Sequence, residues 1–409
     1  MGYVAVKAGE EIIERAAALF EKQRLEGATE PLTVDQLDEQ LGRLTAQAES
    51  EAGLSAPRLA ALAVKQAQGD TVEAAFLLRA YRSTLERWDE TPTVDPGETF
   101  ATRRVSPAYK DVPGGQILGP TEDYTRRLLD FGLAEEGGES PPDPTADWDA
   151  DGDGGDPPDR LANVIEVLRE RGLLHEPADP PAGEPADTTR EPVTHPAGRD
   201  AVLQELARGE TGAMTALGYS ALRGYGAVHP TLGEVRVGRL PVRIEHPYTG
   251  EEVTVTEAPV TECEAVVPVY AKREDPEFAF GYGLTFGRNE RKAIAMSVLD
   301  ASIQLGGDHP AENAEFVLDT VDGLDSFGFI EHLKLPHYVT FQSILDRIRS
   351  IRERAANGEG NRDPGEDGDA AGDGPVDRAG GRDGEASRDA AEERARAADA
   401  GDAREGGPE

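Results

Sequence analysis

The strand-like stretches in the second half of the chain follow one another directly, and this order restricts the possible folds more than any other feature. Four short segments have the residue pattern of strands: residues 234–237, 240–245, 253–256 and 263–270. No segment with helical periodicity separates them, although the repeating units of a doubly wound parallel sheet would require one. The order therefore predicts an α+β fold.

The first part of the chain has the periodicity of helices. In residues 10–22, apolar residues recur at positions that share one face of a helix. Thr33 and Gln36 form the pattern of a capping box, and Pro57 suits the first turn of a further helix. We expect residues 10–88 to form a helical unit.

The remaining predicted elements belong to a mixed α/β region that follows the helical unit. The same periodicity and boundary signals identify them. We expect strands at residues 103–106 and 315–318, and helices at residues 121–129, 159–171, 201–208, 287–300 and 341–354.

Shifts in composition divide the chain into six segments. Two of them consist largely of charged residues, Gly, Pro and Ala, with almost no large apolar residue, and are predicted to be disordered. The segments are a helical N-terminal domain (1–98), a basic Gly-rich segment that joins the core (99–134), an acidic disordered insertion (135–159), a helix with a Pro-rich linker (160–199), an α+β core (200–355) and a disordered acidic tail (356–409).

The charge of the chain limits its partners. Asp and Glu number 79 against 42 Lys and Arg, which leaves a formal net charge of −37. Such a surface repels nucleic acid and anionic lipid, so neither is expected to bind. Because the excess is spread along the chain, it also favours a protein that works at high salt, as in a halophilic archaeon.

The single cysteine, Cys263, excludes an internal disulfide and any cluster that needs several cysteines of this chain. It lies in a strand-like segment, which favours a buried structural thiol over a nucleophile. No apolar run approaches the length of a membrane span, and the first residues lack the pattern of a signal peptide. We therefore expect a cytoplasmic protein.

Several basic residues stand in Gly-containing, apolar surroundings, which is unusual in so acidic a chain. Glycine lets the backbone approach a ligand, and cationic side chains bind phosphate or phosphonate oxygens. The alternative is that each of these residues pairs with a local carboxylate. The strongest candidate is the turn at 287–292, because it begins a predicted helix and a helix start favours an anion. The candidate anion-binding residues are Lys110, Arg223, Arg288, Arg291 and Lys292.

His229 and Glu234 are the candidate acid and base. They stand five positions apart in a segment that we predict to be a loop, and either could move a proton, or Glu234 could hold a water for attack on an anomeric carbon. An ordinary structural role in a turn is the alternative. Neither a nucleotide P-loop nor a nucleophile elbow is present.

His332 and His337 are the candidate metal ligands. They flank Pro336, which disfavours a continuous helix, so a turn could bring both imidazoles to one point. Zinc needs three or four ligands, and two histidines are too few. Further ligands would have to be distant carboxylates or come from another chain. The alternative is two ordinary histidines in a surface loop.

Six blocks of this sequence, in order, resemble the PhnI family of carbon-phosphorus lyase subunits. The resemblance covers nearly the whole of the chain outside the predicted insertion, linker and tail. The blocks are residues 3–10, 74–82, 110–121, 221–226, 229–234 and 331–338.

The resemblance implies a role in phosphonate catabolism. Members of the family, with PhnG, PhnH and PhnL, displace adenine from ATP with methylphosphonate to give α-D-ribose 1-methylphosphonate 5-triphosphate, and alone they are associated with ATP and GTP nucleosidase activity. It also implies a core complex that contains two copies of this chain and the PhnJ subunit. A zinc ion shared with PhnJ would be held by His332 and His337, and the iron-sulfur cluster would belong to PhnJ.

The competing hypothesis is a scaffold without catalytic activity. In that case the ordered surface of the chain would position PhnJ and PhnH, while the chemistry took place elsewhere. Substitution of the basic Gly-containing turns distinguishes the two hypotheses, because only the enzymatic one requires these residues for turnover.

Overall fold

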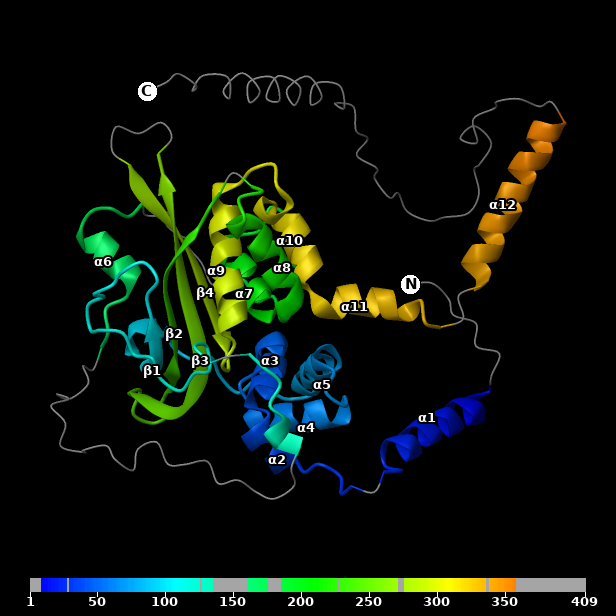
Figure 1. Cartoon of the computed structure of the whole chain (residues 1–409), viewed down its shortest axis with the longest axis horizontal. Coiled ribbons are helices and arrows are strands. Elements are labelled where there is room, and N and C mark those ends of the chain that lie inside the picture. The colour runs from blue at the N-terminus through cyan, green and yellow to red at the C-terminus, as the bar shows by residue number, and fades with distance from the viewer. Residues whose placement is uncertain are drawn as a thin grey trace, which may run out of the picture. The chain divides into compact units, whose positions relative to one another are not determined.

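The computed structural model divides the chain into two compact units, residues Met1–His337 and Tyr338–Glu409 (Figure 1). The predicted insertion at 135–159 and nearly all of the predicted tail lie outside the described residues. The structure describes residues 9–27, 29–125, 127–134, 160–175, 185–226, 228–270, 276–335 and 338–357.

Four short helices near the N-terminus pack around a small core of their own. Its buried residues are mostly alanines, together with Val64 and Leu78. The capping box is confirmed: the Gln36 amide donates to the Thr33 hydroxyl at 3.1 Å, and the Thr33 amide donates to the Gln36 side chain at 2.9 Å. The helices are α2 (Val34–Gln40), α3 (Gly42–Ala52), α4 (Pro57–Gln66) and α5 (Thr71–Ser83), and α1 (Glu10–Arg24) precedes them with none of its residues buried.

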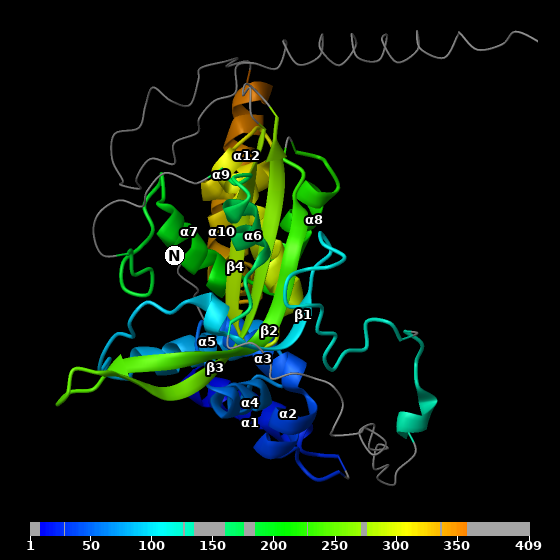
Figure 2. The ribbon, with the colours of Figure 1, turned by 90° about the vertical axis from the view of Figure 1, so that its left-hand side faces the viewer.

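A four-stranded antiparallel sheet forms the centre of the first unit and confirms the α+β class. The predicted strands at 234–237 and 240–245 are parts of one strand, as are those at 253–256 and 263–270. The strands are β1 (Phe100–Val105), β2 (Thr231–Glu245), β3 (Glu252–Val269) and β4 (Glu277–Phe286), in the order β1-β2-β3-β4. Figure 2 shows β2 and β3 continuing as a two-stranded ribbon beyond β1 and β4.

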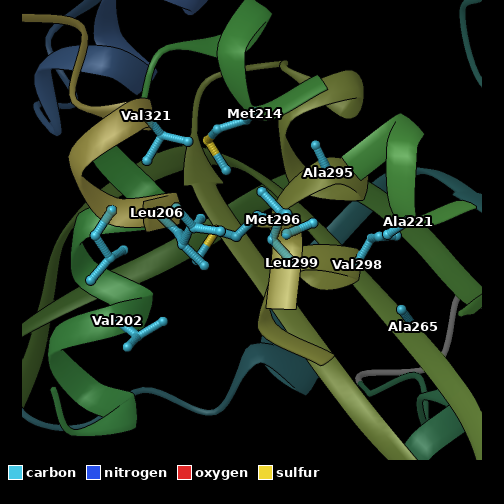
Figure 3. Packing of buried hydrophobic residues seen from close by; sticks show 13 residues of the cluster. Val202, Leu206, Met214, Ala221, Ala265, Ala295, Met296, Val298, Leu299 and Val321 are labelled. Carbon is cyan, nitrogen blue, oxygen red and sulfur yellow. The ribbon is translucent and has the colours of Figure 1, made fainter. Parts of the chain in front are cut away.

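One face of the sheet is covered by a central helix, α9 (Glu290–Leu305), and three helices that share its hydrophobic core (Figure 1). Ten of the sixteen residues of α9 are buried. Met296 and Leu299 of α9 pack among Leu206, Met214 and Val321 of its neighbours (Figure 3). The neighbours are α7 (Arg199–Arg208), α8 (Thr211–Leu222) and α10 (Ala314–Val321).

Glycines let β4 lie directly against α9. A Cβ atom at Gly281 would lie 2.0 Å from the Ser297 carbonyl oxygen, and one at Gly283 would lie 2.5 Å from that of Ala293. Both glycines point to the same side of β4 because side chains alternate along a strand. They also explain why no strand was predicted here, since glycine interrupts the usual β pattern.

The opposite face of the sheet is covered by α6 (Val164–Glu170) and the segment that precedes it. Val164, Ile165 and Leu168 of this region pack with Val112 and Val266. The prediction of a helix at 159–171 is therefore confirmed in type, although the helix is shorter.

Two predicted elements are wrong. Residues 315–318 belong to the helix α10, whose first turn is capped by the side chain of Asn313, and not to a strand. Of the residues predicted as a helix at 121–129, those that the structure describes are turns and extended chain. The predicted last helix is confirmed as α12 (Tyr338–Ala356), and α11 (Gly323–His332) was not predicted.

Three short 3₁₀ turns complete the described elements, Pro96–Glu98, Phe131–Ala134 and Pro310–Glu312. Within the described ranges, no helix is both long and apolar enough to cross a membrane.

Candidate functional site

A layer of charged side chains is buried between the sheet and the segment that leads into α6. It arises from period-two alternation: charged residues occupy neighbouring positions of adjacent strands on one face. The register pairs Arg104 with Arg236, Arg236 with Glu262, and Glu234 with Glu264. Tyr282 of β4 lies opposite Glu264.

Glu234 is the centre of this layer. Its carboxylate accepts hydrogen bonds from Arg104 Nε at 2.8 Å and from the Val164 backbone amide at 3.3 Å, and it lies 2.7 Å from an Arg236 guanidinium nitrogen. Only 1% of the residue is exposed. The predicted strand that begins at Glu234 is confirmed as part of β2, whereas the placement of Glu234 in a loop is wrong, and its oxygens are committed to holding the fold.

His229 lies on the surface, so the predicted acid and base are not brought together. It is exposed in the connection between α8 and β2, whereas Glu234 is enclosed beneath α6. Among the described residues, no hydrogen bond or ion pair joins these two side chains. The interpretation of these residues as an acid–base pair is not supported.

The layer contains two further glutamates, Glu262 and Glu264. Burial raises the pKa of Glu264 well above its usual range, and burial also raises that of Glu262. Glu264 accepts a hydrogen bond from the Ile165 amide at 3.1 Å, and Glu262 accepts one from the Tyr282 hydroxyl at 2.9 Å. Three carboxyl groups face two guanidinium groups here, and the raised pKa values favour the protonated form of the excess carboxyl group.

The two buried arginines also anchor the chain that covers them. Arg104 donates to the carbonyl oxygens of Pro113 at 2.6 Å and Ala162 at 2.7 Å, and Arg236 donates to that of Leu161 at 3.0 Å. The layer thus fixes the 106–117 connection and the start of α6 to the sheet. These contacts give two of the basic residues in Gly-containing surroundings a structural role.

The predicted anion site at 287–292 is divided by the fold. The helix start is confirmed, since α9 begins at Glu290 and the Asn289 side chain caps the Lys292 amide at 3.3 Å. Arg288 donates to the Pro120 carbonyl at 2.8 Å and is partly exposed, and Arg291 is exposed. Lys292 is fully buried and points away from solvent.

Lys292 lies in the interior near the first turn of α8. Its ammonium nitrogen has no hydrogen-bond partner among the described residues, and burial lowers its pKa to about 7 against the attraction of Glu51. Glu51 accepts from both the amide and the hydroxyl of Thr211, at 3.1 and 2.8 Å. The carboxylate of Glu51 thus already occupies the N-terminus of α8, beside Lys292. Because Lys292 is buried there, it is not available to an external anion.

Arg223 and His229 are the two predicted site residues that the structure places on one turn. Arg223 is the C-cap residue of α8, and Gly224, with φ of +77°, follows it directly; a Cβ atom at Gly224 would lie 3.8 Å from His229 Nδ1. Arg223 stands over the Tyr219 ring at 6.0 Å, and Glu312 fixes the turn by accepting from the Val228 amide at 3.1 Å. Within the described part of the chain, no hydrogen bond or ion pair joins Lys110 or Arg291 to this turn.

His332 is the last residue of α11 and is partly exposed. Its Nδ1 is hydrogen-bonded to the Phe329 carbonyl, and its ring meets the Phe329 ring edge-on with centroids 4.9 Å apart. His337 lies outside the described residues. Across the described part of the chain, no group of three or more His, Cys, Asp or Glu residues is arranged to hold a metal ion.

Cys263 is a buried thiol, as predicted. It accepts a hydrogen bond from the Ser297 hydroxyl at 3.3 Å, and burial raises the pKa of the thiol well above its usual value. A thiolate nucleophile at this position is therefore disfavoured.

Comparison with known proteins decides the family. A family model described as a bacterial phosphonate metabolism protein, PhnI, matches residues 2–355. The chain is 44% identical over 370 residues to the α-D-ribose 1-methylphosphonate 5-triphosphate synthase subunit PhnI of Rhizobium meliloti, covering 88% of this chain and 98% of the relative. The corresponding Escherichia coli subunit is 43% identical over 363 residues, covering 87% and 100%. This chain belongs to the PhnI family.

A further relative is HtxH of Stutzerimonas stutzeri, which its name assigns provisionally to the C-P lyase subunits. It is 48% identical over 369 residues, which cover 87% of this chain and 97% of the relative. All of the candidate residues fall inside the region that matches the PhnI model, and residues 356–409 fall outside it. The candidate site therefore belongs to the part of the chain that the family shares.

The buried charged layer is the feature that sequence analysis missed. Its signal is present in the sequence as charged residues at alternate positions of strand-like segments, Glu234 and Arg236 in one and Glu262 and Glu264 in another. Alternation of this kind ordinarily indicates the solvated face of a strand. Only the cover that α6 provides makes the face an interior.

Matched substitutions of Glu234 and Glu264 test the charged layer. Glu264→Gln retains an acceptor for the Ile165 amide and replaces a carboxyl group whose raised pKa favours the neutral form, so we expect a change in unfolding free energy of less than about 1 kcal/mol. Glu234→Gln removes the charge that two buried guanidinium groups face and should cost about 3–5 kcal/mol. Urea denaturation at neutral pH measures both, and equal losses would contradict the assignment.

Lys292→Met tests the buried lysine. Because the folded-state pKa of about 7 lies below that of the unfolded chain, the folded protein binds fewer protons between about pH 7 and pH 10. The unfolding free energy of the parent should therefore rise with pH in this window, relative to the variant, by at most about 1.4 kcal/mol per pH unit. Lys65→Met is the control for loss of a lysine, and parallel pH profiles of parent and Lys292→Met would refute the prediction.

Proposed function

We propose that this chain is a subunit of the carbon-phosphorus lyase complex and forms α-D-ribose 1-methylphosphonate 5-triphosphate from ATP and methylphosphonate. The observation that carries the proposal is its similarity, over 98–100% of their length, to two proteins that are named for this synthase. ATP and GTP nucleosidase activity of the chain alone is part of the proposal.

The reaction breaks the bond between ribose C1′ and the base nitrogen. A phosphonate oxygen forms the new bond to C1′, and the departing adenine takes up a proton. The transition state gathers positive charge on the ribose, while the triphosphate and the phosphonate are anionic throughout. The protein must therefore supply exposed cations for the anions and a proton donor for the base.

The turn that holds Arg223 and His229 fits these requirements best. Both side chains are exposed, and the Val228 amide fixes the turn by its hydrogen bond to Glu312. Both side chains are therefore accessible to a ligand. We assign triphosphate or phosphonate binding to Arg223, and protonation of the leaving base to the imidazolium of His229. The exposed Lys110 and Arg291 and the partly exposed Arg288 remain further anion-binding candidates.

We propose PhnG, PhnH, PhnJ and PhnL as partner subunits, with two copies of this chain in the core complex and a cytoplasmic location. The chain's similarity to proteins named as C-P lyase subunits supports an assembly. The net charge of −37 argues against nucleic acid or an anionic membrane as a further partner. An assembly also accounts for the exposed apolar residues at the end of α11, Phe329, Ile330 and the C-cap residue Leu333.

We also propose that His332 and His337 hold a zinc ion together with ligands from PhnJ. The Nδ1 hydrogen bond of His332 to a backbone carbonyl fixes the tautomer whose Nε2 has a lone pair, as in many metal-binding histidines. No group of three or more potential ligands is found among the described residues, and zinc needs three or four, so we assign the remaining ligands to PhnJ. A zinc ion there would join the two chains through imidazole ligands.

A non-catalytic scaffold that positions PhnJ and PhnH is the second candidate function. The burial of Glu234 and Lys292 favours it, because it removes two of the predicted site residues from contact with substrate. The enzymatic proposal therefore depends on the exposed turn that holds Arg223 and His229.

Adenine release distinguishes the two functions. We expect the chain, with its partner subunits, ATP and methylphosphonate, to release adenine, and His229→Ala to lower kcat at least tenfold. Arg223→Ala should mainly raise KM, because it removes ground-state binding of an anion. Arg239→Ala, in β2 where the two-stranded ribbon of β2 and β3 begins, is the control for loss of an exposed arginine. Unchanged turnover in both site variants, with an intact complex, would favour the scaffold.

Zinc content tests the metal proposal. We expect about one zinc per copy of this chain in the purified complex and little in the chain alone, since two imidazoles bind zinc weakly. His332→Ala should remove the zinc from the complex, whereas His246→Ala, a histidine in the β2–β3 turn, should not. Elemental analysis measures both, and full zinc in a His332→Ala, His337→Ala double variant would exclude these ligands.

A further inference from the structure

The helix α12 has an apolar seam that no described residue of its own unit covers. Phe341, Ile344, Ile348 and Ile351 recur at intervals of three, four and three residues, the spacing of a helix face that packs against another surface. These side chains are 48–62% exposed, and no residue of α12, all of which the structure describes, is buried. A helix that exposes such a seam is marginal in water without a partner.

The seam is flanked by positive charge. α12 has four arginines against Asp346 and Glu353, a net charge of +2 in a chain of −37. Arg347, Arg352 and Arg354 take the positions beside the seam, whereas Arg349 lies on the far side and pairs with Asp346 at 3.4 Å. The arrangement places cations where the edge of a binding partner would lie.

These flanking charges disfavour a second copy of α12 as the partner. In a parallel pair of helices, Arg347 would face Arg352 of the other copy, and an antiparallel pair would also place flanking arginines together. Like charges at these positions repel. The seam needs an apolar surface whose edges are acidic.

An anionic membrane is also a poor match. The apolar face is a narrow seam rather than a broad face, and the net charge of the whole chain opposes approach to anionic lipid. The family model extends to residue 355, one residue before the helix ends, so the helix belongs to the region that the family shares. A protein partner that occurs with the family fits both observations.

We propose that α12 docks through this seam into an apolar, acid-rimmed groove on another subunit of the complex, as an amphipathic helix in a groove. Apolar contacts supply most of the affinity, and Arg347, Arg352 and Arg354 fix the orientation by meeting carboxylates at the rim. The inference rests on the proposed function only in requiring that the chain assembles with other subunits.

Co-expression of the full chain with PhnG, PhnH and PhnJ tests the proposal. Two variants address its two parts: Ile344→Asp with Ile348→Asp places charge in the seam, and Arg347→Glu with Arg352→Glu and Arg354→Glu reverses the flanks. Arg349→Glu, on the far side of the same helix, is the matched control. Because no residue of α12 is buried, these substitutions leave the core of the first unit unchanged.

Retention of the partner subunits is measured by size-exclusion chromatography and by titration calorimetry of this chain against the purified partners. We expect at least a tenfold loss of affinity for the seam variant and for the flank variant, and less than a twofold change for Arg349→Glu. Amide exchange in residues 341–351 should slow at least tenfold in the parent complex relative to the chain alone.

Four outcomes would overturn the proposal: parental affinity in the seam variant, equal amide exchange with and without partners, dimerisation of the isolated chain that the seam variant abolishes, or binding of α12 to phosphatidylserine vesicles at 0.15 M salt.

Adenine release by the complex is recorded in parallel. Assembly that depends on α12 without adenine release would contradict the proposed function alone, and adenine release with assembly indifferent to α12 would contradict the inference alone.

Discussion

The ion pairs of Glu234 with Arg104 and Arg236 are the constraint on which the rest of this structure depends. All three side chains are at most 2% exposed. Enclosing such charges costs several kcal/mol for each ion, so the arrangement persists only because nearly every polar atom finds a partner. The arginines find theirs in backbone carbonyls of two connections, and the glutamate finds one in the first turn of α6. One buried carboxylate thus determines where three separate segments meet.

This constraint divides the basic residues of the chain into two groups. Arg104, Arg236 and Lys292 lie inside and have no exposed surface to offer a ligand. Arg223 and Arg291 lie outside. A strongly acidic protein therefore uses part of its positive charge to hold the interior together, and only the remainder can meet the phosphate and phosphonate groups of the proposed substrates.

Local sequence signals predicted the position of several helices better than they predicted which residues are buried. The capping box at Thr33 and the last helix followed from spacing and composition, because those signals act within a few residues. The β4 strand did not, since Gly281 and Gly283 are explained only by the approach of α9. Glu234 looked accessible because its cover comes from residues seventy positions earlier in the chain. For His332, the sequence indicated a metal ligand; the described residues contain no group of three or more potential ligands, so this stays a prediction.

The contact between β4 and α9 has a consequence for how this chain can diverge. It is made by backbone atoms, since the glycines leave no side chain between strand and helix. Elsewhere in the core, a larger residue at one position can be accommodated by a smaller one beside it. A side chain added at Gly281 or Gly283 would meet backbone atoms, which cannot be replaced by smaller ones. Substitutions can therefore accumulate around Met296 and Leu299, whereas these two glycines must be kept.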